Sequence, residues 1–107
     1  VEAWMARGGH LRSGITQPVA AAEIGIPKYQ LTTWLHQQGV KYNEWLARHR
    51  VAEAKRVMLE HPEWGMDAVA EYCGFSDRSV MHRKFREMEG VTPAEFVGRV
   101  HKTPGNL

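Results

Sequence analysis

Hydrophobic residues along the middle of the chain recur with the period of an α-helix. Leu46, Val51, Ala54, Val57 and Met58 follow one another at spacings near 3.6 residues, which places them on one face of a long helix. Runs of β-branched residues that alternate with polar ones, the pattern of a half-buried strand, are absent from the sequence. Single glycines and prolines divide the chain instead. The pattern therefore predicts an all-α fold.

The same punctuation predicts about seven helices with short connections. Thr16, Asn43 and Ser76 are the expected N-caps, because their side chains accept hydrogen bonds from the first turn of a helix. Residues 92–95 are Thr-Pro-Ala-Glu, a capping box with proline in the first turn. We expect a short helix around Trp4 and Met5 that ends near Gly8, then helices at about 17–24, 27–38, 44–61, 66–73 and 77–89, and a last short one from Pro93 through Phe96.

Two parts of the chain share a spaced pattern of small and apolar residues. Each copy has an alanine four residues before a glycine, followed by an amphipathic helix of similar length. A small residue lets two helices pack closely, and a glycine takes the positive φ of a tight turn. The repeat therefore predicts two helix-turn-helix units. The matched residues are Ala21 and Ala70, Gly25 and Gly74, Leu31 and Met81, and Leu35 and Phe85.

The domain organisation follows from the repeat and from the long apolar stripe between its copies. We expect a first helix-turn-helix lobe over residues 1–41, a linker helix over 42–62 and a second lobe over 63–107, both lobes homeodomain-like. Each lobe has room for only a small core. Trp34 and Trp45 are expected to lie in the core.

The net charge of +2 does not by itself indicate a nucleic-acid partner, but its distribution is uneven. Residues 77–86 hold four Lys/Arg and one acid, and Met81, Phe85 and Met88 form the buried stripe of the same helix. For an isolated helix, such a face is more often simply solvated. The alanine–glycine turn before it and the repeat favour a DNA-recognition helix instead, because arginine pairs with guanine and neutralises phosphate. The exposed candidates are Arg78, Ser79, His82, Arg83 and Arg86.

The sequence around this helix resembles a known family. Ala-Glu-Tyr-Cys-Gly-Phe-Ser-Asp-Arg-Ser at 70–79, with Phe85 and Gly-Val-Thr-Pro-Ala-Glu-Phe at 90–96, resembles the signature of AraC/XylS-family transcription regulators. Trp45-Leu46, Arg50 and Ala54 resemble the linker helix of that family. The motifs Gly-Ile-Thr at 14–16 and Trp-Leu-Ala at 45–47 are most similar to Bacteroidetes-type members. The resemblance spans roughly residues 15–100.

This resemblance implies the C-terminal DNA-binding domain of a bacterial regulator. In the family, two lobes joined by a rigid helix insert recognition helices, here about 27–38 and 77–89, into successive major-groove segments of double-stranded promoter DNA. The second lobe would bind through Arg78, Ser79, His82 and Arg83. The matching first-lobe residues are Lys28, Tyr29, Thr32 and Thr33.

The first lobe departs from the family pattern. Thr33 stands where many members have a basic residue, and Lys28 is the only Lys or Arg between Pro27 and Gln38. Pro27 also replaces the usual serine cap. We therefore expect the first lobe either to bind weakly or to recognise DNA shape and thymine methyl groups through Tyr29 and the threonines.

Other kinds of site have little support. The six histidines include no pair at the i, i+3 or i+4 spacing that lets one helix supply two metal ligands, so we expect no metal or other cofactor. Phosphate-binding and nucleophile-elbow motifs are absent, and we expect no enzymatic activity. Cys73, the one cysteine, is expected to be buried, and a lone thiol favours the cytoplasm. No apolar run approaches the roughly 18 residues of a membrane span, so we expect no membrane contact.

Two alternatives to DNA binding remain at this point. A helical protein-interaction module could present the same basic face to another regulator or to RNA polymerase. RNA binding is a third hypothesis, although the chain lacks the aromatic sheet that binds single-stranded RNA. Salt dependence distinguishes these hypotheses, because duplex binding that neutralises phosphates weakens steeply with salt. The first residues, Val-Glu-Ala-Trp, suggest a domain of a longer protein whose sensor or dimerisation domain lies elsewhere.

Overall fold

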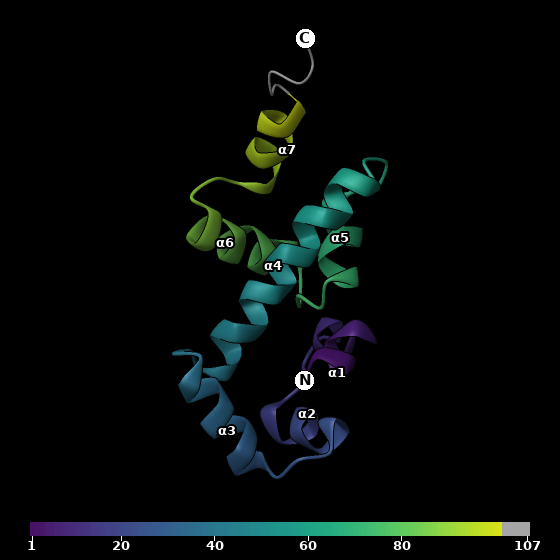
Figure 1. Cartoon of the computed structure of the whole chain (residues 1–107). Coiled ribbons are helices and arrows are strands. Elements are labelled where there is room, and N and C mark those ends of the chain that lie inside the picture. Colours follow the sequence, from purple (N-terminus) through teal and green to yellow (C-terminus); the bar gives the residue numbers. More distant parts are fainter. Residues whose placement is uncertain (102–107) are drawn as a thin grey trace.

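A long central helix, α4 (Tyr42–Glu60), joins two groups of shorter helices in the computed structural model of the chain (Figure 1). The structure describes residues 1–101, and within that range it contains α-helices and one 3-10 helix but no strand. The molecule is elongated, with extents of 50 × 25 × 23 Å. The all-α prediction is confirmed. The other elements are α1 (Glu2–Ala6), η1 (Gly9–Leu11), α2 (Gln17–Ile24), α3 (Lys28–Gln37), α5 (Met66–Tyr72), α6 (Arg78–Glu89) and α7 (Pro93–His101).

Two of the predicted N-caps are wrong by one or two residues. Asp77, not Ser76, caps α6, and its Oδ1 accepts a hydrogen bond of 2.8 Å from the amide of Val80. Both side chains can cap a helix, and the extended backbone of Asp77 decides which one does. Asn43 lies inside the first turn of α4, since Lys41 is the extended residue before that helix. Thr16 is the N-cap of α2 as predicted, although its side chain makes no capping hydrogen bond.

The predicted capping box at the start of α7 is confirmed. The amide of Thr92 donates to Glu95 Oε1 at 3.0 Å, and the amide of Glu95 donates to Thr92 Oγ1 at 3.1 Å. These hydrogen bonds lower the pKa of the Glu95 carboxyl. The helix continues to His101, beyond the Phe96 that the sequence marks. The 3-10 helix η1 was not predicted, because three residues are too few to show a period.

The linker helix α4 completes two separate cores. Its first half contributes Trp45 and Leu46 to a core with α2 and α3, and its second half contributes Val51 and Val57 to a core with α5 and α6. The apolar stripe along α4 therefore belongs to both lobes. Trp45 is buried as predicted, whereas Trp34 is only partly buried and packs against the edge of the first core.

The internal repeat is confirmed as a repeated packing arrangement. Ala21 and Ala70 are buried where the two helices of each unit cross, and the turns that follow contain Gly25 at φ +93° and Gly74 at φ +87°. Such φ values favour glycine over residues with a Cβ. The two large apolar residues of each following helix are also buried. Each lobe is thus a helix-turn-helix unit, α2–α3 in the first and α5–α6 in the second.

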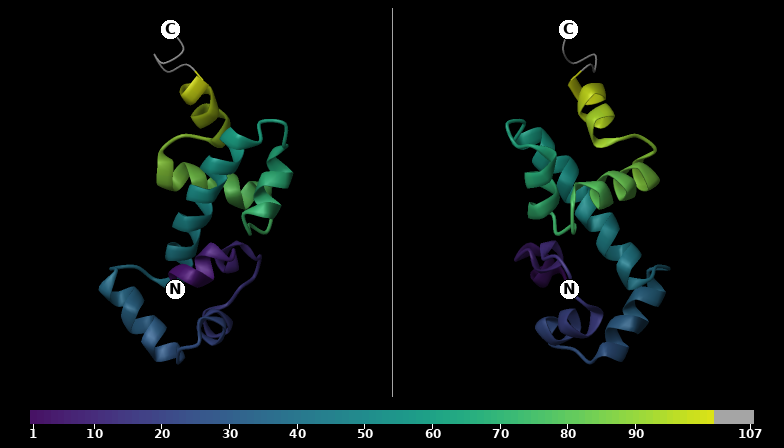
Figure 2. Two further views of the ribbon diagram at one scale, coloured as in Figure 1. Left: turned by 45° about the vertical axis from the view of Figure 1, so that its right-hand side comes forward. Right: turned by 180° about the vertical axis from the view of Figure 1, so that it is seen from behind.

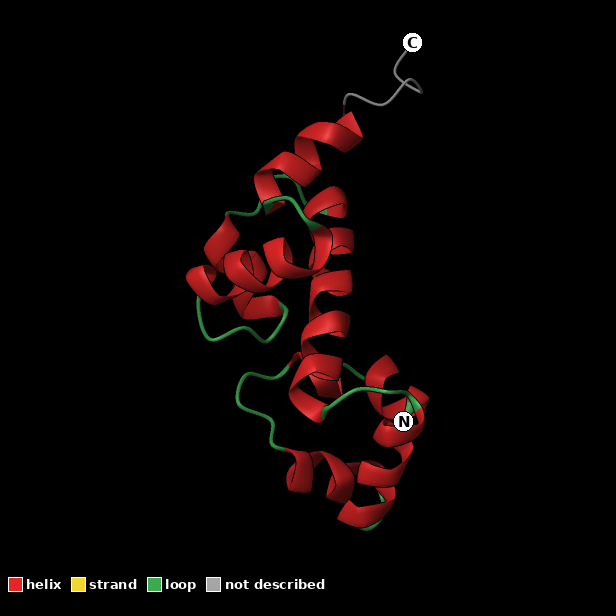
Figure 3. Ribbon diagram, turned by 90° about the vertical axis from the view of Figure 1, so that its left-hand side faces the viewer, coloured by secondary structure: helices red, strands yellow, loops and turns green. Residues whose placement is uncertain are grey.

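The second helices of the two units lie on the same side of the molecule. In Figure 1, α6 lies to the left of the upper half of α4 and α3 lies below the lower end of α4, so both are on the left side of the molecule, while α2 and α5 are on its right side. The view from behind in Figure 2 shows α3 and α6 together again, now on the opposite side of the picture. Figure 3 looks onto this side, with the two lobes one above the other. The fold therefore presents α3 and α6 in one direction.

Candidate nucleic-acid interface

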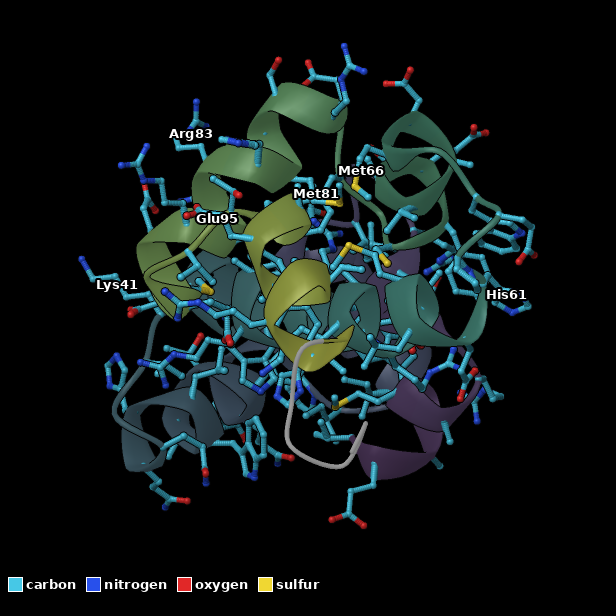
Figure 4. All side chains as sticks on the ribbon, turned by 90° about the horizontal axis from the view of Figure 1, so that it is seen from above. Lys41, His61, Met66, Met81, Arg83 and Glu95 are labelled. Atoms are coloured by element: carbon cyan, nitrogen blue, oxygen red, sulfur yellow. The ribbon has the colours of Figure 1, made fainter. Side chains whose placement is uncertain are left out.

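Helix α6 separates an apolar face from a polar one. Met81 and Phe85 are fully buried in the second core, and Val80 and Met88 pack against its edge. In Figure 4, Met81 points into the molecule, whereas Arg83 extends outward on the side opposite His61. The outward face has the five side chains predicted from the sequence, all exposed: Arg78, Ser79, His82, Arg83 and Arg86.

The arginine side chains of this face form few ion pairs or hydrogen bonds within the described residues. Within residues 1–101, Arg83 forms no ion pair or hydrogen bond through its side chain. The Nε of Arg78 lies 3.7 Å from Asp67 Oδ1, but both side chains are mostly exposed, so the pair contributes little to stability. The guanidinium groups therefore remain available to an external anion.

The predicted residues of the first lobe lie on the corresponding face of α3, but their hydroxyl groups are already occupied. Thr33 Oγ1 donates to the carbonyl oxygen of Tyr29 at 2.9 Å, and Thr32 Oγ1 donates to that of Lys28 at 3.2 Å. Thr32 Oγ1 also accepts a 2.8 Å hydrogen bond from Gln17 Nε2. A threonine has a single O–H, so neither residue retains a donor for a base. Their methyl groups remain, beside the exposed ring of Tyr29.

A hollow lies at the same place in each lobe, where three elements meet. It is bounded by the start of the first helix of the unit, the outward face of the recognition helix, and the start of the helix that follows. The volumes are 310 Å³ in the second lobe and 580 Å³ in the first. The second-lobe hollow is lined by Met66, Arg78, Ser79, Met81, His82, Pro93 and Ala94. The first-lobe hollow is lined by Gln17, Thr32, Leu35, His36, Val40, Lys41, Tyr42, Asn43 and Glu44.

Several lining residues of the two hollows occupy equivalent positions, and the first-lobe hollow includes side chains that the sequence pattern did not mark. Gln17 matches Met66, Thr32 matches His82, and Tyr42 matches Pro93, at offsets of 49, 50 and 51 residues. Extending the alanine–glycine repeat in both directions would have found these matches. The structure thus adds Gln17, His36 and Lys41 to the first-lobe face, with His36 in the place that Arg86 takes in the second.

The described residues give little support for a reactive thiol, a metal site or a membrane span. Cys73 is buried, and burial raises the pKa of its thiol to about 12, which leaves it unreactive. Within residues 1–101, no three His, Cys, Asp or Glu side chains are grouped so as to hold a metal ion. In the same range, no helix combines the length and the hydrophobicity needed to cross a membrane.

Known proteins share this fold and this sequence pattern. Residues 20–99 match the family model described as a helix-turn-helix domain, and the chain belongs to that family. The regulatory protein PocR of Salmonella typhimurium is 27% identical over 94 residues, which are 87% of this chain and 31% of PocR. The chain therefore spans about a third of the length of that relative.

Solved structures with a similar fold include several regulators. The DNA-binding domain of AdpA, solved in complex with a target DNA, has a TM-score of 0.74 and 25% identity, and covers 94% of this chain and 93% of its own. A DNA-binding transcriptional dual regulator from Escherichia coli K-12 has a TM-score of 0.79 and 22% identity, over 92% of this chain and 88% of its own. An AraC-type regulator from Chromobacterium violaceum has a TM-score of 0.73 and 20% identity, over 84% and 80%. With the family match, these findings define the chain as a helix-turn-helix DNA-binding domain of a transcription regulator.

Proposed function

We propose that the chain is the sequence-specific, double-stranded DNA-binding domain of a bacterial regulator of the AraC/XylS family, and that α3 and α6 enter successive major-groove segments. The observation that carries the proposal is the exposed arginine face of α6, in which only Arg78 forms an ion pair within the described residues, on the same side of the molecule as α3. Major-groove segments on one side of a duplex repeat about every 34 Å, so a rigid chain with two such helices can reach both. The similarity to Bacteroidetes-type members and a C-terminal place in the full protein belong to the same proposal.

On α6 the roles divide along the helix. Arg78, Ser79, His82 and Arg83 lie in its first half, and in helix-turn-helix proteins this half meets the base edges. Arg86 lies further along, where a cation meets the phosphate backbone. Arginine suits both positions, because its guanidinium pairs with guanine through two hydrogen bonds and also neutralises phosphate.

On α3 the contacts are of another kind. The hydroxyl donors of Thr32 and Thr33 are used within the helix, so these residues present methyl groups to a base. The favoured partner is the thymine methyl group, with Tyr29 adding apolar contact and Lys28 meeting a phosphate. We therefore propose that the first lobe contributes less electrostatic attraction than the second and recognises A·T-rich positions.

The remaining parts of the proposal concern the setting of the domain. We propose that the first lobe spans residues 1–41, the linker helix 42–62 and the second lobe 63–107, with α4 completing the core of both lobes. We propose a cytoplasmic regulator without enzymatic activity or a cofactor, whose sensor or dimerisation domain lies elsewhere in the full protein. RNA polymerase is a further proposed partner.

A selection from random DNA duplexes tests the proposed function. We expect the chain to enrich a two-part motif, and the affinity for the enriched duplex to fall with salt at a log–log slope of about −0.9 for each phosphate contact. A scrambled duplex of the same length and composition is the control for non-specific attraction. No enrichment, together with no salt-dependent affinity for any duplex, would favour the protein-interaction module instead.

A further inference from the structure

A single arginine in the middle of α4 holds the N-terminal segment of the first lobe. Arg50 Nε donates to the carbonyl oxygen of His10 at 2.8 Å, and its Nη2 donates to that of Arg12 at 2.8 Å. These two carbonyls flank Leu11, the last residue of η1. The guanidinium is partly buried, and this burial lowers its pKa. Through these two hydrogen bonds, Arg50 fixes the backbone around Leu11 in place.

The turn between α5 and α6 lies directly against the backbone of Leu11, which Arg50 holds. A Cβ on Gly74, between α5 and α6, would lie 2.5 Å from the carbonyl oxygen and 2.6 Å from the carbonyl carbon of Leu11. It would also lie 3.0 Å from Arg50 Nε. Two backbones that approach this closely leave no room for a side chain between them. The first and second lobes thus meet at Leu11 and Gly74, and Arg50 lies beside the contact.

This contact is connected to both recognition helices through short paths. On the second-lobe side, Gly74 comes four residues before Arg78, the first residue of α6. On the first-lobe side, the N-terminal segment is tied to α2 by the hydrogen bond of 2.9 Å from Trp4 Nε1 to Glu23. A second tie runs from Tyr42 Oη to the carbonyl oxygen of Ile15, also at 2.9 Å. The relative position of α3 and α6 is therefore held at two points, α4 itself and this contact.

We propose that Arg50, Leu11 and Gly74 form an inter-lobe brace that sets the separation of α3 and α6 and so selects the spacing between the two half-sites on DNA. The inference rests on the proposed DNA-binding function. A helix alone bends gently along its length, whereas a second attachment point removes that bending. Adding one base pair moves a half-site by roughly 3.4 Å and rotates it around the duplex, which a braced pair of helices cannot follow.

Part of the brace lies outside the region that defines the family. The family model matches residues 20–99, so Leu11 and the carbonyl groups on either side of it precede the match. Arg50 is then a positioning residue: its Nε and Nη2 donate to backbone carbonyl oxygens, and it acts through the N-terminal segment. Its loss is expected to change the preference for spacing rather than the affinity of either lobe alone.

The test uses the full chain with Arg50→Met, and Arg48→Met as the matched control. Arg48 lies on the same helix, but it is exposed, and within residues 1–101 its only ion pair is with Glu44, at 3.3 Å. Fluorescence anisotropy at one salt concentration gives Kd for the selected duplex, for duplexes with the half-sites one base pair closer or further apart, and for a duplex with the second-lobe half-site alone.

We expect the unmodified chain and Arg48→Met to lose about tenfold in affinity when the spacing changes by one base pair. Arg50→Met should lose no more than about threefold, while its Kd for the lone half-site stays within about twofold of the unmodified value. An unchanged spacing profile in Arg50→Met would overturn the brace. Failure of the unmodified chain to bind any duplex would overturn the proposed function instead, so the two failures are distinguishable.

A measurement without DNA keeps the inference testable if Arg50→Met is poorly folded. Nitroxide labels at Gln30→Cys on α3 and Glu87→Cys on α6, both exposed positions, report the distance between the recognition helices. The native Cys73 is buried and should escape labelling. With the milder Arg50→Lys, in which a single ammonium replaces the two guanidinium nitrogens that hold the His10 and Arg12 carbonyls, the distance distribution should broaden, while Arg48→Lys leaves it unchanged. Equal distributions in the two variants would contradict the brace.

Discussion

The two lobes share one helical plan and present different chemistry at equivalent positions. Arg83 of α6 corresponds to Thr33 of α3, and His82 corresponds to Thr32. In the second lobe the outward face has exposed cations, whereas in the first the hydroxyl groups bond to their own backbone. This shared helix-turn-helix arrangement requires only an alanine, a turn glycine and two large apolar residues in each copy. The exposed positions are therefore free to diverge, and a fold repeat does not imply equal roles in binding.

The two turn glycines differ in the same way. Gly25 and Gly74 both have positive φ, but a Cβ on Gly25 would meet nothing within 4 Å, whereas one on Gly74 would strike Leu11. The first turn faces solvent and the second forms the contact between lobes. Equivalent residues thus differ in their surroundings as well as in their chemistry, and each difference can be tested by a matched pair of substitutions.

The largest expected effect comes from the turn glycines. Gly25→Ala should lower the free energy of unfolding by about 1–2 kcal/mol, the cost of a left-handed backbone for a residue with a Cβ. Gly74→Ala should lower it by at least about 3 kcal/mol, because the new methyl group also forces the Leu11 backbone to move. Urea unfolding measured by circular dichroism gives both values. Equal losses would show that the inter-lobe contact does not constrain the turn.

The next effect concerns DNA affinity. Arg83→Ala should weaken binding to a selected duplex by about 1–3 kcal/mol, either as a lost base contact or as a lost phosphate contact with a salt slope smaller by about 1. Thr33→Ala should cost less than about 1 kcal/mol, since it removes one methyl group and a hydroxyl that bonds within the helix. Anisotropy titrations of both variants give the comparison, with their melting temperatures as a folding control. Similar losses would contradict the unequal division between lobes.

The smallest effect is on the pH dependence of stability. His10 is buried beside the rings of Trp4 and His49, and its Nδ1 has no hydrogen-bond partner within the described residues. Burial lowers the pKa of His10, and the nearby His49 and Arg50 lower it further, while Glu53 raises it. The unfolded chain, with an ordinary histidine pKa near 6.5, therefore binds the proton first. Stability should be complete above about pH 7 and decrease as the pH falls below 6.5.

A histidine substitution isolates this contribution. His10→Gln should reduce the loss of stability between pH 7.5 and pH 5 in urea unfolding experiments. His49, whose pKa is also lowered by burial, accounts for part of the loss that remains. The same slope in His10→Gln as in the unmodified chain would show that His10 does not titrate on unfolding.

The sequence by itself determined the α-helices and most of the buried residues of the two cores. Helix positions, the inward residues Met81 and Phe85, and the capping box at Thr92 and Glu95 depend on neighbours within one or two turns, and these are visible as spacing. The repeat made both lobes predictable for the same reason. The choice between Asp77 and Ser76 as a cap was not predictable, because either side chain fits and the backbone conformation decides.

Only the tertiary structure decided which distant groups meet. Gln17 reaches Thr32 across two helices, and this pairing, together with the bonds inside α3, determines what the first lobe can offer to a base. Leu11 lies against Gly74, far along the chain, and no periodic pattern connects them. The outward arginine face of α6 therefore followed from local spacing. Its placement relative to α3 depends on how α4, η1 and the second turn pack, and only three-dimensional packing specifies such contacts.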